Sequence, residues 1–205
     1  MAVQVSVNQQ ALSIERAAVE LFSHIFSYDG QLVHNRGICC LDFGPLFAVS
    51  KDVAQRLHVL GRSHGMGANR LWARAHEEGI RMGLGNIDDF AFSGPFSLSV
   101  NLLAGLSFEL LLKSAYVALG GQSKDSYLRN EIGHDLVIAL ERAKEQGFYS
   151  QAPYLEEVVG RINEPYKKNW FRYNPQDVLL PEFEAINSAL VSLEADVGRL
   201  CKALD

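Results

Sequence analysis

The chain has 205 residues, of which 48% are hydrophobic and 21% are charged, and it carries a net charge of -5 at pH 7. This length accommodates one large domain, or one domain with an appendage, and the composition is ordinary for a soluble globular protein. The acidic balance argues against a dedicated, sequence-independent binder of duplex nucleic acid, which is usually basic, although it leaves room for a local basic groove.

The first part of the chain predicts mostly helix. Residues 13–26 have apolar side chains at the three- and four-residue spacing of an amphipathic helix, whereas residues 28–49 are punctuated by glycine and proline and predict irregular chain. Ser50 is a suitable N-cap for a helix that we expect to stop at Gly61. A further helix is predicted over residues 69–82, ahead of a turn-like stretch.

A change of pattern near residue 90 divides the chain into two parts. We predict that residues 1–92 are an N-terminal, mostly helical extension and that residues 93–205 form a helical bundle. The alternative is that both parts belong to one domain, because no clean linker separates them.

The most apolar stretch follows this boundary and predicts a long helix. Pro95 suits the first position of a helix, and the adjacent Gly120 and Gly121 suit its end. The leucines between these signals leave almost no polar face, which is typical of a helix inside a core or across a membrane.

Two charged residues decide between a core helix and a membrane span. Glu109 and Lys113 lie one helical turn apart, with the acid first, so they can pair along the helix surface. Unpaired charges are costly in lipid, so we expect a buried bundle helix and no membrane association. Asn101 falls close to the same face, which predicts one polar strip on this helix.

The next segment, residues 129–134 (RNEIGH), predicts a corner before a second helix over residues 135–146. On one unbroken helix Arg129 and His134 would point roughly 140° apart, given 3.6 residues per turn. A break at Gly133 would let both side chains converge. An arginine can clamp a phosphate, and a histidine can move a proton near neutral pH. Cleavage of a phosphodiester needs both actions.

The last part of the chain predicts two more helices around a basic and aromatic loop. A helix is expected over residues 153–163, with Pro165 forcing an end or a kink. Residues 166–175 predict the loop. Pro181 opens a long final helix whose apolar residues alternate three and four apart, a narrow seam that suits packing on another helix. That seam can serve the bundle itself or a second copy of the chain. The predicted fold class is therefore all-α.

Two of these segments resemble the HEPN superfamily (higher eukaryotes and prokaryotes nucleotide-binding domains). The first is residues 103–113 (LAGLSFELLLK), and the second is the helix entrance at residues 133–136 (GHDL). The resemblance covers residues 93–204 and implies an up-and-down helical bundle. Ribonuclease members share an arginine, usually followed by a polar residue, and then a histidine a few positions later. Arg129, Asn130 and His134 fit that pattern.

The resemblance implies a metal-independent endoribonuclease without cofactors, of a toxin–antitoxin or defence system. Arg129 would clamp phosphate, His134 would act as general acid or base, and Asn130 would orient the pair. Glu109 and Lys113 would form a supporting polar pair. Such enzymes are homodimers in which two motif copies form one cleft, so a homodimer is expected, with RNA or an antitoxin as further partners. The alternative is a non-catalytic HEPN module that binds a nucleotide or a protein partner.

The basic and aromatic loop offers a second set of candidate contacts. Lys167, Lys168 and Arg172 can meet phosphates while Tyr173 or its aromatic neighbours stack on bases. The competing interpretation is that the aromatic side chains fill the core and the charges face water. The scattered histidines form no ligand cluster with the carboxylates, so no metal site is predicted.

The cysteines and the first residues of the chain indicate the cellular compartment in which the protein is expected. Cys39 and Cys40 are adjacent, and Cys201 is distant, which is neither a disulfide framework nor a zinc spacing. The opening residues MAVQVSVNQQ have no basic segment followed by an apolar one, so no signal peptide is expected. We therefore expect a cytoplasmic protein.

Overall fold

The computed structural model describes residues 46–85, 97–173 and 180–204. These residues form seven α-helices and one π-helical turn, and no strand occurs among them, so the predicted all-α class is confirmed. The expected helix at residues 13–26 lies outside the described residues, as does nearly all of the expected irregular stretch at 28–49. The elements are α2 (Leu46–Arg81), α4 (Ser97–Ala118), α5 (Asp125–Tyr127), η1 (Leu128–Ile132), α6 (Leu136–Glu145), α7 (Leu155–Lys167), α8 (Trp170–Tyr173) and α9 (Phe183–Ala203).

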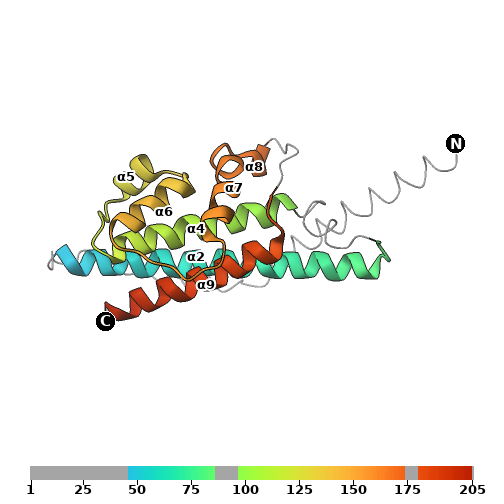
Figure 1. Ribbon diagram of the computed structural model, residues 1–205, viewed down its shortest axis with the longest axis horizontal. Coiled ribbons are helices and arrows are strands. Elements are labelled where there is room, and N and C mark those ends of the chain that lie inside the picture. Colours follow the sequence, from blue (N-terminus) through green and yellow to red (C-terminus); the bar gives the residue numbers. More distant parts are fainter. Residues whose placement is uncertain (1–45, 86–96, 174–179, 205) are drawn as a thin grey trace, which may run out of the picture.

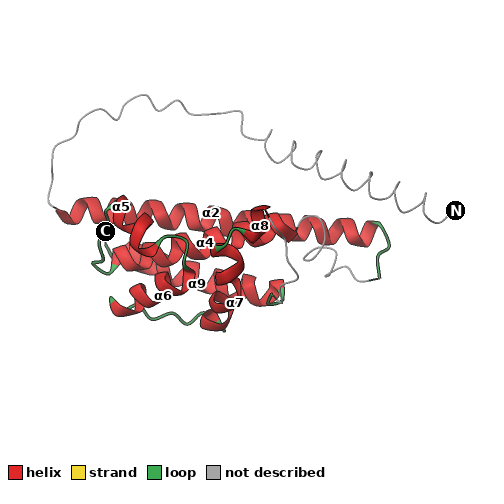
Figure 2. Cartoon of the chain, turned by 90° about the horizontal axis from the view of Figure 1, so that it is seen from above, coloured by secondary structure: helices red, strands yellow, loops and turns green. Residues whose placement is uncertain are grey.

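Helix α4 is the centre of the bundle. In Figure 1 the long helices α2 and α9 run along one side of it, and the shorter elements from α5 to α8 cover the other side. Figure 2 shows α2 extending along the length of the bundle. This arrangement leaves every residue of α4 buried or half-buried, as its lack of a polar face predicts.

Burial of α4 bears on the question of a membrane span. Among the described residues α4 is the one helix long and apolar enough to cross a membrane, but 67% of its apolar window is buried inside the bundle.

The glycine stop predicted for α4 is confirmed, because Gly120 has a φ of +99° just beyond the last helical residue. The predicted start at Pro95 lies outside the described residues.

The prediction that a helix stops at Gly61 is wrong. Helix α2 runs unbroken for 36 residues and joins the two helices expected at 50–61 and 69–82. The glycines serve close packing: a Cβ on Gly61 would lie 2.9 Å from Cγ of Leu111, and one on Gly65 would lie 2.8 Å from Oγ of Ser107. Ser107 also donates a hydrogen bond of 2.8 Å to the carbonyl of Gly61. Contacts with α4 thus offset the roughly 1 kcal/mol that each glycine costs a helix.

Helix α2 shares its hydrophobic core with the rest of the bundle. Ala54, Ala68, Leu71 and Ala75 are buried in the same cluster as the core residues of α4 and α9. This favours the alternative in which this part of the predicted extension belongs to one domain with residues 97–204.

The end of the chain follows the predicted pattern with one correction. Helix α7 continues through Pro165 to Lys167, so the expected end of the helix at that proline is wrong. Proline has no backbone N–H, so Pro165 costs α7 the hydrogen bond to the residue four positions earlier, and the helix ends two residues later at Lys167. On α9 the apolar seam is buried in the bundle itself over Phe183, Ile186, Leu190, Leu193 and Val197.

Candidate functional site

The predicted corner at Gly133 is present. A π-helical turn over Leu128–Ile132 ends at Gly133, whose φ of 60° and ψ of -134° suit glycine and few other residues. Asp135 then caps α6, because its side chain accepts a hydrogen bond of 3.1 Å from the backbone N–H of Ile138. His134 is therefore held between a glycine corner and a capped helix start.

A polar cluster, buried except for His134, connects this corner to α4 and α7. We call Glu109, Lys113, His134 and Tyr166 the Glu109 cluster. Oε1 of Glu109 accepts from Nζ of Lys113 at 2.7 Å, and Oε2 accepts from the Tyr166 hydroxyl at 2.6 Å. The same Oε2 lies 2.9 Å from Nδ1 of His134. Lys113 also donates to the carbonyl of Gly133 at 2.6 Å, which ties the corner to α4.

Glu109 is ionised within this cluster although only 5% of it is exposed. Burial raises the pKa of its carboxyl, but the Lys113 ammonium and the hydrogen bonds from Lys113, Tyr166 and His134 together hold that pKa below its usual value. Burial and the neighbouring Glu109 charge raise the pKa of the Tyr166 phenol well above its usual value. Tyr166 consequently remains a hydrogen-bond donor to a charged carboxylate.

The ionised carboxylate sets the proton position on His134. A carboxylate can only accept, so Nδ1 of a neutral His134 must carry the proton in the 2.9 Å contact with Glu109. Nε2 is then the unprotonated nitrogen and is able to accept a proton. The side chain of His134 is 58% exposed, so a ligand in solvent can reach it. The arrangement has the chemistry of a general base oriented by a carboxylate.

Arg129 and His134 line one surface hollow of about 220 Å³. Leu57, Glu109 and Lys113 line it as well. The Arg129 side chain is 72% exposed and forms an ion pair with Asp125, one turn earlier. Asn130 is also exposed but is not among the residues that line the hollow. The structure thus brings the predicted arginine and histidine to one hollow and leaves the predicted asparagine beside it.

The predicted basic and aromatic loop is largely helical, because it comprises the end of α7 and the short helix α8. Its aromatic residues Tyr166 and Phe171 are buried in the core. Lys167 pairs with Asp135, and Lys168 pairs with Glu164 at 2.8 Å. These contacts match the interpretation in which the aromatic side chains fill the core.

Three further candidate residues lie outside the Glu109 cluster or outside the described side chains. Arg172 is exposed, and the side chain of Tyr173 lies outside the described residues. Asn101, predicted on the polar strip of α4, is buried two turns from Glu109, and its Oδ1 has no hydrogen-bond partner in the described part of the chain. The strip is therefore not continuous, and the polar cluster is confined to the C-terminal half of α4, near the corner.

Tyr166 is the site residue that the sequence did not single out. It lies 57 positions after the glutamate that it contacts, in a segment where its ring resembled a surface aromatic. The signal that points to it is Gly105, a glycine inside an apolar helix one turn before Glu109.

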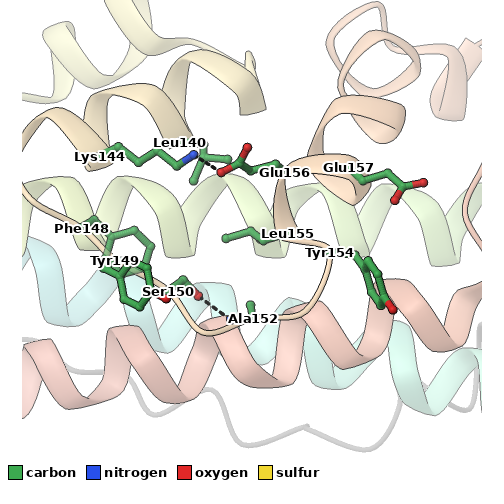
Figure 3. A pocket seen from close by; sticks show the side chains of 10 residues that line it. All are labelled: Leu140, Lys144, Phe148, Tyr149, Ser150, Ala152, Tyr154, Leu155, Glu156 and Glu157. Carbon is green, nitrogen blue, oxygen red and sulfur yellow. Dashed lines mark hydrogen bonds and ion pairs between the residues drawn. The ribbon is translucent and has the colours of Figure 1, made fainter.

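A second hollow, of about 390 Å³, lies between the end of α6 and the start of α7 (Figure 3). Leu140, Phe148 and Leu155 give it an apolar wall, and Lys144 pairs with Glu156 across it. No histidine or cysteine lines this hollow, and none of the predicted site residues reaches it. Each of its charged side chains has a counter-charge, because Lys144 pairs with Glu156 and Glu157 pairs with Arg161.

The described residues contain no group of three or more histidines, cysteines or carboxylates placed to hold a metal ion. Comparisons of the chain with protein-family models, with curated proteins and with solved structures find no match. The functional interpretation therefore rests on the geometry of the Glu109 cluster and its hollow.

Proposed function

We propose that the chain is a HEPN-like, metal-independent endoribonuclease. One observation carries the proposal: His134 has Nδ1 on a buried, ionised Glu109 and shares a hollow with the exposed Arg129. A base, the group that orients it and a cation for phosphate are thereby present in one place.

The proposed reaction needs only these groups. Nε2 of His134 takes the proton from a ribose 2′-hydroxyl, whose oxygen attacks the adjacent phosphorus. The bond from phosphorus to the 5′-oxygen breaks, and that oxygen takes a proton from an imidazolium or from water. The products are a 2′,3′-cyclic phosphate and a 5′-hydroxyl. Arg129 stabilises the negative charge that develops on the non-bridging oxygens.

Two copies of the chain would make a better site than one. The hollow is small and open on a single chain, and Arg129 projects into solvent beside Asp125. Phosphate would have to compete with Asp125 for this guanidinium. A second Arg129 from a facing copy would add positive charge to the same phosphate, so we propose a homodimer that meets at this hollow. A cytoplasmic setting, an antitoxin partner and RNA contacts from Lys167, Lys168, Arg172 and Tyr173 are further parts of this proposal.

The test is cleavage of mixed RNA by the purified protein, with and without a chelator. Wild-type protein should cleave RNA equally in both conditions and leave cyclic phosphate ends. His134→Ala should abolish cleavage, and Arg129→Ala should lower it by roughly 100-fold or more, as loss of a transition-state charge contact does. The matched control is Arg142→Ala, since Arg142 is also an exposed arginine paired on its own helix.

Two outcomes of this test would remove the ribonuclease assignment. One is unchanged cleavage by a folded His134→Ala protein, and the other is an absence of cleavage by wild-type protein on any RNA. The second outcome would favour the non-catalytic alternative, in which the hollow binds a nucleotide or a protein partner. The ion pair of Arg129 with Asp125 is the observation against catalysis, because it already neutralises the guanidinium that would bind the phosphate.

A further inference from the structure

Gly105 provides a slot in the surface of α4 that the Tyr166 ring fills. A Cβ atom on Gly105 would lie 2.3 Å from Cδ2 of Tyr166, 2.7 Å from Cε2 and 2.9 Å from Cγ. Real Cβ atoms do not approach so closely, so the ring lies directly against the backbone of α4. Any larger residue at position 105 would push Tyr166 outward.

The slot lies one turn before Glu109 on the same face of α4, because residues four apart on a helix are neighbours. From this position the Tyr166 hydroxyl reaches Oε2 of Glu109 at 2.6 Å. The ring also meets the imidazole of His134 edge-on, with 6.1 Å between the ring centroids and 88° between the planes. One buried tyrosine therefore contacts both the carboxylate and the histidine.

The donors around Glu109 leave its carboxylate no freedom to turn. Lys113 takes Oε1, while Tyr166 and His134 share Oε2. Rotation of the carboxylate would break all three contacts inside a region where an unpaired buried polar group is costly. Tyr166 and Lys113 together thus fix where the acceptor for Nδ1 of His134 lies, and Tyr166 is the donor on the oxygen that His134 uses.

A second tyrosine also packs on a glycine, and it shows that such packing alone does not connect a tyrosine to the Glu109 cluster. The ring of Tyr116 covers Gly121, because a Cβ atom on Gly121 would lie 2.5 Å from that ring. The ring of Tyr116 stacks on Tyr127, which lies outside the Glu109 cluster. What distinguishes Gly105 and Tyr166 is the hydroxyl aimed at Glu109.

We propose that Tyr166, seated on Gly105, is a positioning residue that keeps the proton of neutral His134 on Nδ1 and Nε2 free toward the hollow. The effect on the imidazole stands by itself, and the consequence for catalysis rests on the proposed ribonuclease function. No part of Tyr166 needs to touch RNA.

The test reads the protonated nitrogen of His134 directly. Protein labelled with ¹⁵N in histidine is studied by long-range ¹H–¹⁵N spectra at alkaline pH, where imidazoles are neutral. His134→Ala identifies the signal. Wild-type His134 should show a protonated Nδ1, whereas Gly105→Ala should move the signal toward the Nε2-protonated form. Tyr166→Phe, which keeps the ring in the slot and removes the hydroxyl, should give a smaller shift in the same direction.

The control is Gly160→Ala, because a Cβ at Gly160 on α7 meets no atom within 4 Å. It should leave the His134 signal unchanged. If Gly105→Ala does not fold, the His134 signal of Tyr166→Phe alone decides whether Tyr166 positions the proton. A wild-type signal from the Nε2-protonated form, or wild-type signals in every folded variant, would overturn the proposal.

A parallel RNA assay separates this proposal from the proposed function. Gly105→Ala and Tyr166→Phe should lower kcat by roughly tenfold or more and leave KM within about threefold, since they act through the base and not through RNA binding. Should wild-type protein fail to cleave RNA, the ribonuclease proposal is lost while the NMR result still decides the role of Tyr166.

Discussion

The two opposite sides of α4 both use glycine for close packing, but with different consequences. On the side facing α2, Gly61 and Gly65 let the two backbones approach over Leu111 and Ser107. On the side facing α7, Gly105 admits an aromatic ring that carries a hydroxyl into a charged cluster. The first contact stabilises the bundle, and the second positions a side chain that is exposed to solvent.

This difference shows how one helix serves both the fold and the site. The α2 side is apolar apart from Ser107 and Ser114, whose hydroxyls donate to carbonyls of α2, so its stabilising free energy comes mainly from burial and dense contacts. The α7 side buries an acid and a base that would be costly if either lost its partner. A substitution on the α2 side should therefore change the free energy of unfolding and leave the protonated nitrogen of His134 unchanged. A substitution on the α7 side should change both.

Glu109→Gln is expected to cause the largest loss in the free energy of unfolding. This change leaves the Lys113 ammonium buried without its carboxylate, and breaking a buried pair in this way costs about 3–5 kcal/mol. Denaturant unfolding should show the loss. Glu156→Gln is the control, because Glu156 pairs with Lys144 at the exposed second hollow. Such a surface pair contributes about 0–1 kcal/mol. Equal losses in the two variants would contradict the buried role of Glu109.

An intermediate effect is expected from Gly61→Ala on the α2 side. The added methyl meets Leu111 at 2.9 Å from Cγ and 3.1 Å from the backbone nitrogen, so the helices must separate or the leucine must move. Overpacking of this kind costs about 1–3 kcal/mol in unfolding free energy. The ¹⁵N signal of His134 should stay at its wild-type position.

Gly67→Ala is the matched control for that variant. Its Cβ would lie 3.5 Å from Cδ1 of Leu103, an ordinary contact, so helix propensity should raise stability by up to about 1 kcal/mol. Two glycines of the same helix are thus expected to respond with opposite signs. A loss at position 67 as large as that at position 61 would mean that α2 and α4 are packed differently.

Lowering the pH is expected to have the smallest effect on the stability of the fold. The pKa of Glu109 is below its ordinary value in the folded chain, as is that of Asp135, where burial is outweighed by Lys167 and the contacts with Ile138 and Asn163. Carboxyls with lowered pKa stabilise the fold above their unfolded pKa of about 4. Stability should therefore be level near neutrality and fall as the pH drops below about 4. Unfolding midpoints across acidic pH measure this, and a rise in stability on acidification would contradict the ionised Glu109.

The sequence predicted the parts of this architecture that depend on local pattern. The Glu109 and Lys113 pair follows from their spacing, and the corner follows from Gly133. The stop expected at Gly61 was wrong, because a glycine that ends a helix and one that admits a neighbouring helix look the same locally. Tyr166 escaped prediction for a related reason, since its partner lies 57 residues away and only the folded chain brings them together.

The most direct test of the link between the buried pair and the site is the double variant Glu109→Gln with Lys113→Met. Removing both charges at once leaves no unpaired ion, so the unfolding free energy should stay within about 2 kcal/mol of wild type. His134 would lose its carboxylate, so RNA cleavage should fall by roughly 100-fold or more, as loss of general acid–base catalysis does. Cleavage at the wild-type rate by the folded double variant would show that Glu109 does not orient a catalytic histidine.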